Sequence, residues 1–110
     1  MKSNSQTIPL ACNMSVFTPA EREHHIQTIT QLFRTVQQIH DLEQGYEFIF
    51  PSESATLIQL AEFISKERLC CPFLEFTIKI IPNYETTYLL LTGPEGTQEF
   101  LRLEFSEAFQ

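Results

Sequence analysis

The sequence predicts an α+β domain: a two-layer sandwich, ferredoxin-like or related, with helices on one face of a mainly antiparallel sheet. Its 110 residues fit a single domain. Segments with apolar residues at helical spacing alternate with segments in which every second residue is apolar. Proline, glycine and asparagine mark the turns between them. We expect one domain over residues 18–110, preceded by a flexible or extended N-terminal segment over residues 1–17.

The first helix is expected over residues 19–40. Thr18 can cap it, Pro19 suits the first helical position, and Glu21 completes a capping box. Behind the cap, apolar residues recur at helical spacing. They are Ile26, Ile29, Leu32, Phe33, Val36 and Ile39. Before the helix, residues 8–11 could form a short strand, which Pro9 would confine to a sheet edge.

The three histidines all fall in this helix. His24 and His25 are adjacent, so their side chains point about 100° apart and cannot easily bind one ion. We expect both at the surface. His40 is expected at the C-terminal end of the helix, where the helix dipole favours a positive charge.

A strand and a second helix are expected next. Aromatic residues at 46, 48 and 50 alternate with Glu47 and Ile49, which predicts a strand that ends at Pro51. Ser52 or Ser54 can then cap a helix. The helix should end near Leu69, because Pro72 has no N–H group to donate. Its expected apolar positions are Leu57, Ile58, Leu60, Ala61 and Ile64.

A hairpin and a third helix complete the expected fold. Apolar residues alternate with polar ones over residues 74–80, Pro82-Asn83 marks a turn, and residues 86–92 are rich in β-branched and apolar side chains. The run Gly93–Gly96 breaks the second strand. Apolar residues in the last segment predict a helix over residues 97–109.

Aromatic residues on the expected strands suggest a further packing surface. Tyr46, Phe48, Phe76 and Tyr88 supply more aromatic area than one three-stranded layer needs. Dimerisation through a sheet face or edge would explain the surplus, so we expect a homodimer. The alternative is that the long first helix covers the second face.

The net charge limits the classes of binding partner to be expected, and the cysteine count bears on the cellular compartment. Seven basic and fourteen acidic residues give a formal charge of −7, and nucleic-acid binding depends on basic side chains that neutralise phosphates. We therefore expect neither nucleic acid nor a membrane as a partner. Three cysteines, two of them adjacent, do not resemble a secreted disulfide framework, and the N-terminus has no signal-peptide core. The expected location is the cytoplasm.

The adjacent thiols of Cys70 and Cys71 are the main candidate for chemistry. They stand where the second helix gives way to a strand, and element ends often carry sites. Both could bind one soft metal ion, for which Zn(II), Cu(I) and Hg(II) are the candidates. Alternatively, one could pair with Cys12, the remaining cysteine. Glu67 and Arg68, one turn earlier, are candidates for a supporting role.

The segment around these cysteines resembles a family of small, largely uncharacterised bacterial proteins. The family motif is Glu-Arg-x-Cys-Cys-x-Phe-x-x-Phe, which here runs from Glu67 to Phe76. The family tends to have an early cysteine before the first helix, matched by Cys12, a Gly-Tyr-x-Phe-x-Phe-like strand, matched from Gly45 to Phe50, and a Leu-Thr-Gly-Pro-like turn, matched from Leu91 to Pro94. The resemblance implies a thiol site and no particular reaction.

Three functional hypotheses follow. The leading one is a non-enzymatic protein that binds or senses a soft metal ion through Cys70 and Cys71, with Cys12 as a possible third ligand. The second is a thiol redox protein, which requires a cysteine of lowered pKa. The third is a structural or interaction module in which the cysteines are inert core residues and Glu67–Arg68 is a solvated helix end.

Overall fold

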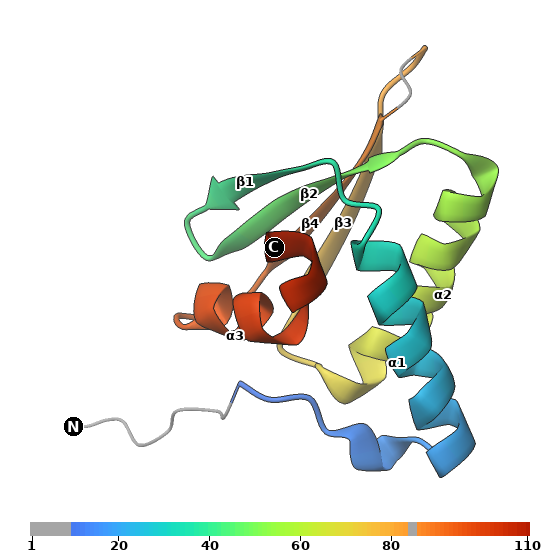
Figure 1. Ribbon diagram of the computed structural model, residues 1–110. Coiled ribbons are helices and arrows are strands. Elements are labelled where there is room, and N and C mark those ends of the chain that lie inside the picture. The colour runs from blue at the N-terminus through green and yellow to red at the C-terminus, as the bar shows by residue number, and fades with distance from the viewer. Residues whose placement is uncertain (1–9, 84–85) are drawn as a thin grey trace.

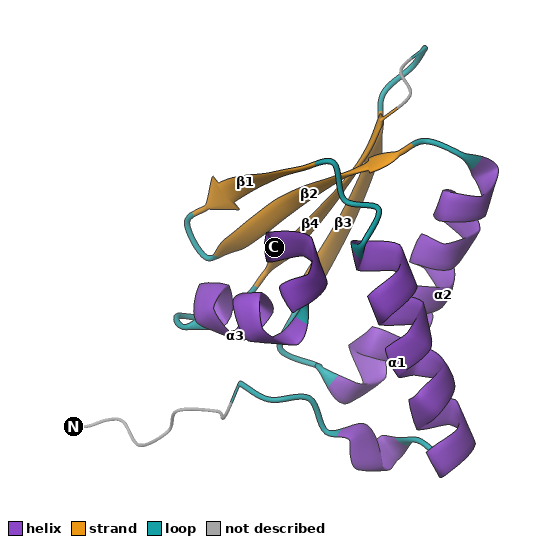
Figure 2. Ribbon diagram, viewed as in Figure 1, coloured by secondary structure: helices purple, strands orange, loops and turns teal. Residues whose placement is uncertain are grey.

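The computed structural model describes residues 10–83 and 86–110 and confirms the α+β class. Four strands form one open antiparallel sheet in the order β1-β2-β4-β3. The helices gather on one face of this sheet and form the second layer (Figure 1; Figure 2). The main elements are α1 (Pro19–Phe33), β1 (Gln38–Leu42), β2 (Gly45–Pro51), α2 (Ser54–Cys70), β3 (Glu75–Ile80), β4 (Thr86–Thr92) and α3 (Thr97–Glu104). Two 3₁₀ turns, η1 (Met14–Val16) and η2 (Ser106–Phe109), flank them.

The first helix begins as predicted and ends earlier. Thr18 and Glu21 form the expected capping box, and Pro19 opens α1. The prediction that the helix continues to residue 40 is wrong, because residues 38–42 form strand β1. This strand pairs with β2 along its whole length, from Gln38 opposite Ile49 to Leu42 opposite Gly45. Val36 and Ile39 fit a helical spacing equally well, but pairing with the neighbouring strand determines the structure here.

The predicted third helix is also shorter than expected. The regular helix α3 stops at Glu104, and the 3₁₀ turn η2 follows it. Gly96 precedes α3 with a positive φ of 96°, a conformation that glycine adopts without a steric penalty. The amide of Gln98 donates to the carbonyls of Leu42 and Gly45 at 2.7 and 3.2 Å, which fixes α3 against the β1–β2 turn.

The core lies between the helices and the sheet and is largely aromatic. Phe33 on α1 stacks on Phe105 with ring centroids 4.3 Å apart and meets Phe48, Phe50 and Phe63 edge-on at 5.3 to 5.6 Å. Gly45 allows the close approach of β2 to β4, since a Cβ atom there would lie 1.9 Å from the carbonyl oxygen of Leu91.

The surplus of aromatic residues is partly explained within one chain. Tyr46 and Phe48 are completely buried, and the ring of Phe109 in η2 packs on both. The C-terminal segment therefore covers part of the surface that suggested a partner copy, and the homodimer stays a prediction. Ile8 and Pro9 of the possible edge strand lie outside the described residues, while residues 10–13 form no strand. No helix of the described chain is long and apolar enough to cross a membrane.

Candidate functional site

The candidate site forms at the C-terminal end of α2. Pro72 follows the helix, and the N–H of Cys71 closes its last turn by donating to the carbonyl of Glu67 at 2.8 Å. The expected apolar positions of α2 are confirmed in part: Leu60 is fully buried and Leu57 and Ile64 pack against the core, but Ile58 is 68% exposed. The buried residues are Thr56, Leu60, Phe63, Glu67 and Cys70, spaced alternately by four and three. Glu67 is thus part of the buried face, and its interpretation as a solvated helix end is wrong.

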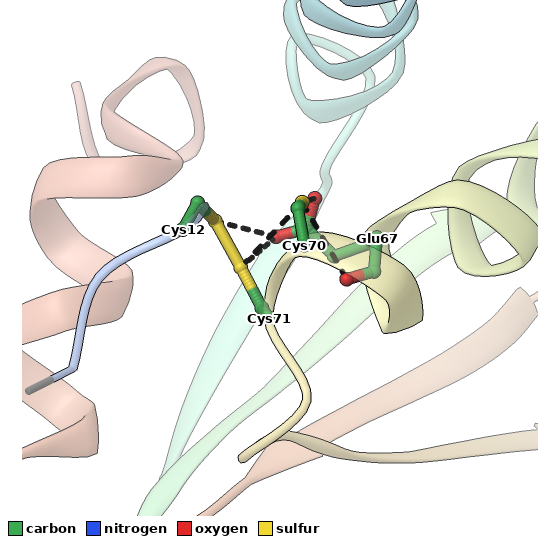
Figure 3. A group of neighbouring side chains, drawn as sticks. All are labelled: Cys12, Glu67, Cys70 and Cys71. Atoms are coloured by element: carbon green, nitrogen blue, oxygen red, sulfur yellow. Dashed lines mark hydrogen bonds between the residues drawn. A yellow bond between two sulfur atoms is a disulfide. The ribbon is translucent and has the colours of Figure 1, made fainter. Parts of the chain in front are cut away.

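The N-terminal segment brings the third cysteine to this helix end. The N–H of Asn13 donates to the carbonyl of Cys70 at 2.8 Å, which places the preceding residue against the turn. Cys12 and Cys71, 59 residues apart in sequence, are joined as a disulfide. Cys70 remains a free thiol. Figure 3 shows the three sulfur atoms and the Glu67 carboxylate facing one another. Of the two alternatives left open by the sequence, the structure shows the pairing of one adjacent cysteine with Cys12.

The carboxylate of Glu67 lies at the centre of the site. One oxygen, Oε1, lies 2.8 Å from Nε2 of His25 on α1. The other, Oε2, lies 3.1 Å from Cys71 Sγ and 3.5 Å from Cys12 Sγ. Reduction of the disulfide would give each of these sulfurs a proton to donate to that oxygen. A buried carboxylate is costly unless its oxygens are paired. In the disulfide-bonded structure the His25 nitrogen pairs with Oε1, whereas Oε2 gains thiol donors from Cys12 and Cys71 only on reduction.

The free thiol of Cys70 is fully buried. Its Sγ lies 3.8 Å from Cys71 Sγ and 3.7 Å from Glu67 Oε1. Burial, reinforced by the negative charge of Glu67, raises the pKa of Cys70 to about 12. Without a bound cation, Cys70 is therefore protonated at neutral pH and is not a reactive nucleophile.

A second carboxyl group, from α3, reaches the site. Glu104 Oε2 lies 3.2 Å from Cys12 Sγ. Burial and, after it, the nearby charge of Glu67 raise the pKa of Glu104 to about 7, while His25 opposes the shift. Glu104 is not among the site residues predicted from the sequence. Position 104 lies 92 residues from Cys12, and no motif joins the two.

The structure brings together most of the predicted site residues. The ligand atoms of Cys12, Glu67, Cys70 and Cys71 all lie within 4.8 Å of one another. Arg68 is exposed, whereas Glu67, Cys70 and Cys71 are buried. We call the group of Cys12, Glu67, Cys70 and Cys71 the cysteine cluster. Three sulfurs and a carboxylate at this spacing are suited either to soft-metal binding or to reversible disulfide chemistry.

Two predictions about histidines are wrong. His25 is 2% exposed and contacts the cluster through Glu67, whereas it was expected at the surface. His40 lies in β1, paired with Glu47 at 3.0 Å, and not at a helix end. The position of His25 could have been inferred from its spacing, because residues 25, 28, 29, 32 and 33 form the buried stripe of α1. The exposed His24 does lie at the surface, where it pairs with Glu62.

No protein-family model, curated protein or solved structure matches this chain. The resemblance to the double-cysteine bacterial family therefore stays a prediction, and the functional argument depends on the geometry of the cysteine cluster.

Proposed function

We propose that the reduced protein binds one soft metal ion through the sulfur atoms of Cys12, Cys70 and Cys71, with the Glu67 carboxylate as a fourth ligand. The observation that supports this most is the convergence of four potential ligand atoms within 4.8 Å. They come from two distant parts of the chain. Packing alone does not require polar groups to converge in a core.

The distance between the adjacent sulfurs supports the proposal. Two sulfur atoms bound to one tetrahedral zinc ion, each at about 2.3 Å, lie about 3.8 Å apart. Cys70 Sγ and Cys71 Sγ are 3.8 Å apart. Already in the oxidised structure, the helix end therefore holds the sulfurs of Cys70 and Cys71 at the spacing that a shared ion needs.

The chemistry of the ligands defines the class of ion. Thiolates prefer soft or borderline cations, so Zn(II), Cu(I) and Hg(II) remain the candidates and hard cations such as Mg²⁺ do not. A bound cation would also favour ionisation of the buried thiols, because its positive charge offsets the desolvation that keeps Cys70 protonated.

The disulfide favours a second candidate, a thiol redox function. Reduction of Cys12–Cys71 consumes two electrons and two protons, which a small dithiol can supply, and yields the two thiols. Because the metal and the disulfide need the same two sulfurs, they exclude each other. The high pKa of Cys70 makes it a poor attacking thiol, so this candidate depends on Cys12 and Cys71.

Equilibrium dialysis of the reduced full-length protein with Zn(II), Cu(I) and Hg(II) tests the proposal. We expect one ion per chain, and an affinity lower by roughly a hundred-fold in the Cys70→Ser/Cys71→Ser variant. Glu67→Gln should weaken binding, whereas Glu62→Gln, which alters a more exposed glutamate of the same helix, should not. Wild-type affinity no better than that of the double-serine variant would contradict the proposal.

Alkylation followed by mass spectrometry separates the redox candidate from the inert module. If the pair is redox-active, Cys12 and Cys71 should change together between oxidised and reduced samples while Cys70 stays reduced. If the cysteines are inert, replacing all three by serine should alter stability and nothing else.

A further inference from the structure

A groove of about 560 Å³ opens beside the cysteine cluster. The N-terminal segment, α1, α3 and η2 form its walls, and the segment can be followed in Figure 1 as it runs past α3 and α1. Cys12, a member of the cluster, lines the groove, and so does Glu104, which contacts the Cys12 sulfur. The apolar lining includes Met14, Ile26, Phe100 and Leu103. The groove thus joins an apolar surface to a sulfur ligand.

Cys12 is the sulfur that a ligand in the groove would meet. Cys70 and Cys71 are completely buried, whereas Cys12 is partly exposed and lines the groove. The route from the groove to the cluster therefore passes Cys12, with Glu104 Oε2 3.2 Å from its sulfur.

The lining indicates both the charge and the polarity of a ligand. It includes two carboxyl side chains, Glu104 and Glu107, and no lysine or arginine among the described residues that form it. Ile26 is 49% exposed and Leu103 is 82% exposed, so apolar surface is available for a ligand to cover. A cation that also carries a hydrocarbon group would satisfy both features.

We propose that the groove holds the hydrocarbon group of a soft-metal cation with one organic substituent, such as an aryl-mercury cation, while Cys12 binds the metal. This inference rests on the proposed function and narrows its ligand class. The organic group occupies one coordination position of the metal, and the cysteine sulfur takes another. The groove adds an apolar subsite that a bare ion does not use.

Binding is a ligand exchange without electron transfer. The bond between the metal and its leaving group, a chloride or a small thiolate, breaks, and a bond from the metal to Cys12 Sγ forms. The thiol proton of Cys12 leaves with the released group as its conjugate acid. The bond between metal and carbon remains intact. The Cys12–Cys71 disulfide must first be reduced, for which a small dithiol suffices.

Competition with a small monothiol measures the contribution of the groove. Reduced full-length protein is equilibrated with phenylmercury or methylmercury in excess monothiol, and the mercury that remains with the protein after gel filtration is measured. A phenyl group buries more apolar area than a methyl group, so we expect the protein to prefer phenylmercury by roughly ten-fold, relative to the monothiol.

Substitutions in the groove test where this preference arises. Ile26→Gln and Leu103→Gln should each reduce the phenyl preference by roughly three-fold, because they make the wall polar without changing its charge. Both side chains are exposed, so folding should be preserved. Ile58→Gln is the matched control, since Ile58 is 68% exposed on α2 and does not line the groove.

The outcomes separate this inference from the proposed function. If the protein retains phenylmercury and methylmercury equally, and the groove substitutions change nothing, the inference is overturned. The proposed function would still stand if the same protein binds Hg(II). If the protein retains no more of any mercury species than a variant with all three cysteines replaced by serine, the proposed function fails as well. A phenyl preference that Ile58→Gln lowers as much as Leu103→Gln would also overturn the inference.

Discussion

The aromatic core and the cysteine cluster are both buried, yet different forces hold them together. In the core, Phe33 contacts four other rings, and these contacts bury apolar surface, which is stabilising whatever the direction of each contact. In the cluster, a few directed contacts converge on Glu67. His25 joins the two regions, because its ring lies against Phe63 and Phe17 while Nε2 faces Glu67. The core accounts for folding, whereas the cluster imposes a desolvation cost that folding does not require.

The largest expected effect comes from the core. Phe33→Ala removes a fully buried ring that packs on four others, and we expect it to lower the free energy of unfolding by about 3–5 kcal/mol. Urea denaturation measures this. Metal stoichiometry should be unchanged wherever the variant remains folded. A loss below about 1 kcal/mol would mean that the core does not dominate stability.

The adjacent histidines His24 and His25 provide a matched test of the contact that links the aromatic core to the cysteine cluster. His25→Leu deprives the buried Glu67 carboxylate of its nitrogen partner and should cost about 1–3 kcal/mol. His24→Leu removes a similar but exposed contact with Glu62 and should cost less than about 0.5 kcal/mol. Denaturation of the two variants side by side gives the comparison. Equal losses would contradict the central position of Glu67.

The pH dependence of stability tests the environment of Glu104. Burial and the charge of Glu67 raise its pKa from 4.5 to about 7, so between these pH values the folded chain holds a proton that the unfolded chain has released. The stability that this group contributes must then fall as the pH rises from 4.5 to 7. Relative to Glu104→Gln, the oxidised wild type should lose about 2–3 kcal/mol across that window. A constant or rising difference between the two urea denaturation series would contradict the burial of this carboxyl.

The smallest expected effect is at Arg68. Arg68 is exposed and is not one of the four residues that define the cluster. Arg68→Ala should change the free energy of unfolding by less than about 0.5 kcal/mol and leave metal affinity unchanged. If dialysis shows that the variant binds metal less tightly, Arg68 has the supporting role that its motif suggested.

The sequence predicted those parts of the fold that short-range patterns determine. The capping box of Thr18 and Glu21, the alternation in β2 and the stop at Pro72 all depend on neighbouring residues. Strand β1 was missed because it is a mostly polar edge strand, whose formation depends on pairing with β2.

The sequence likewise predicted the parts of the site that depend on neighbouring residues, and it missed those that depend on contacts between distant segments. The adjacency of Cys70 and Cys71 is visible in the sequence, but the arrival of Cys12 depends on a backbone hydrogen bond from Asn13 to Cys70. The burial of His25 and of Glu67 could have been inferred from helical spacing, because each residue falls on the buried stripe of its helix. Glu104 was not, because only the tertiary packing of α3 brings it to Cys12.

The coordination of a bound ion tests the central claim most directly. X-ray absorption spectroscopy of the reduced protein with one equivalent of Zn(II) reports the number and kind of atoms around the metal. We expect three sulfur atoms at about 2.3 Å and one oxygen at about 2.0–2.2 Å. A shell of oxygen and nitrogen atoms alone, or a spectrum that is the same after Cys12, Cys70 and Cys71 are replaced by serine, would contradict joint binding by the three sulfurs.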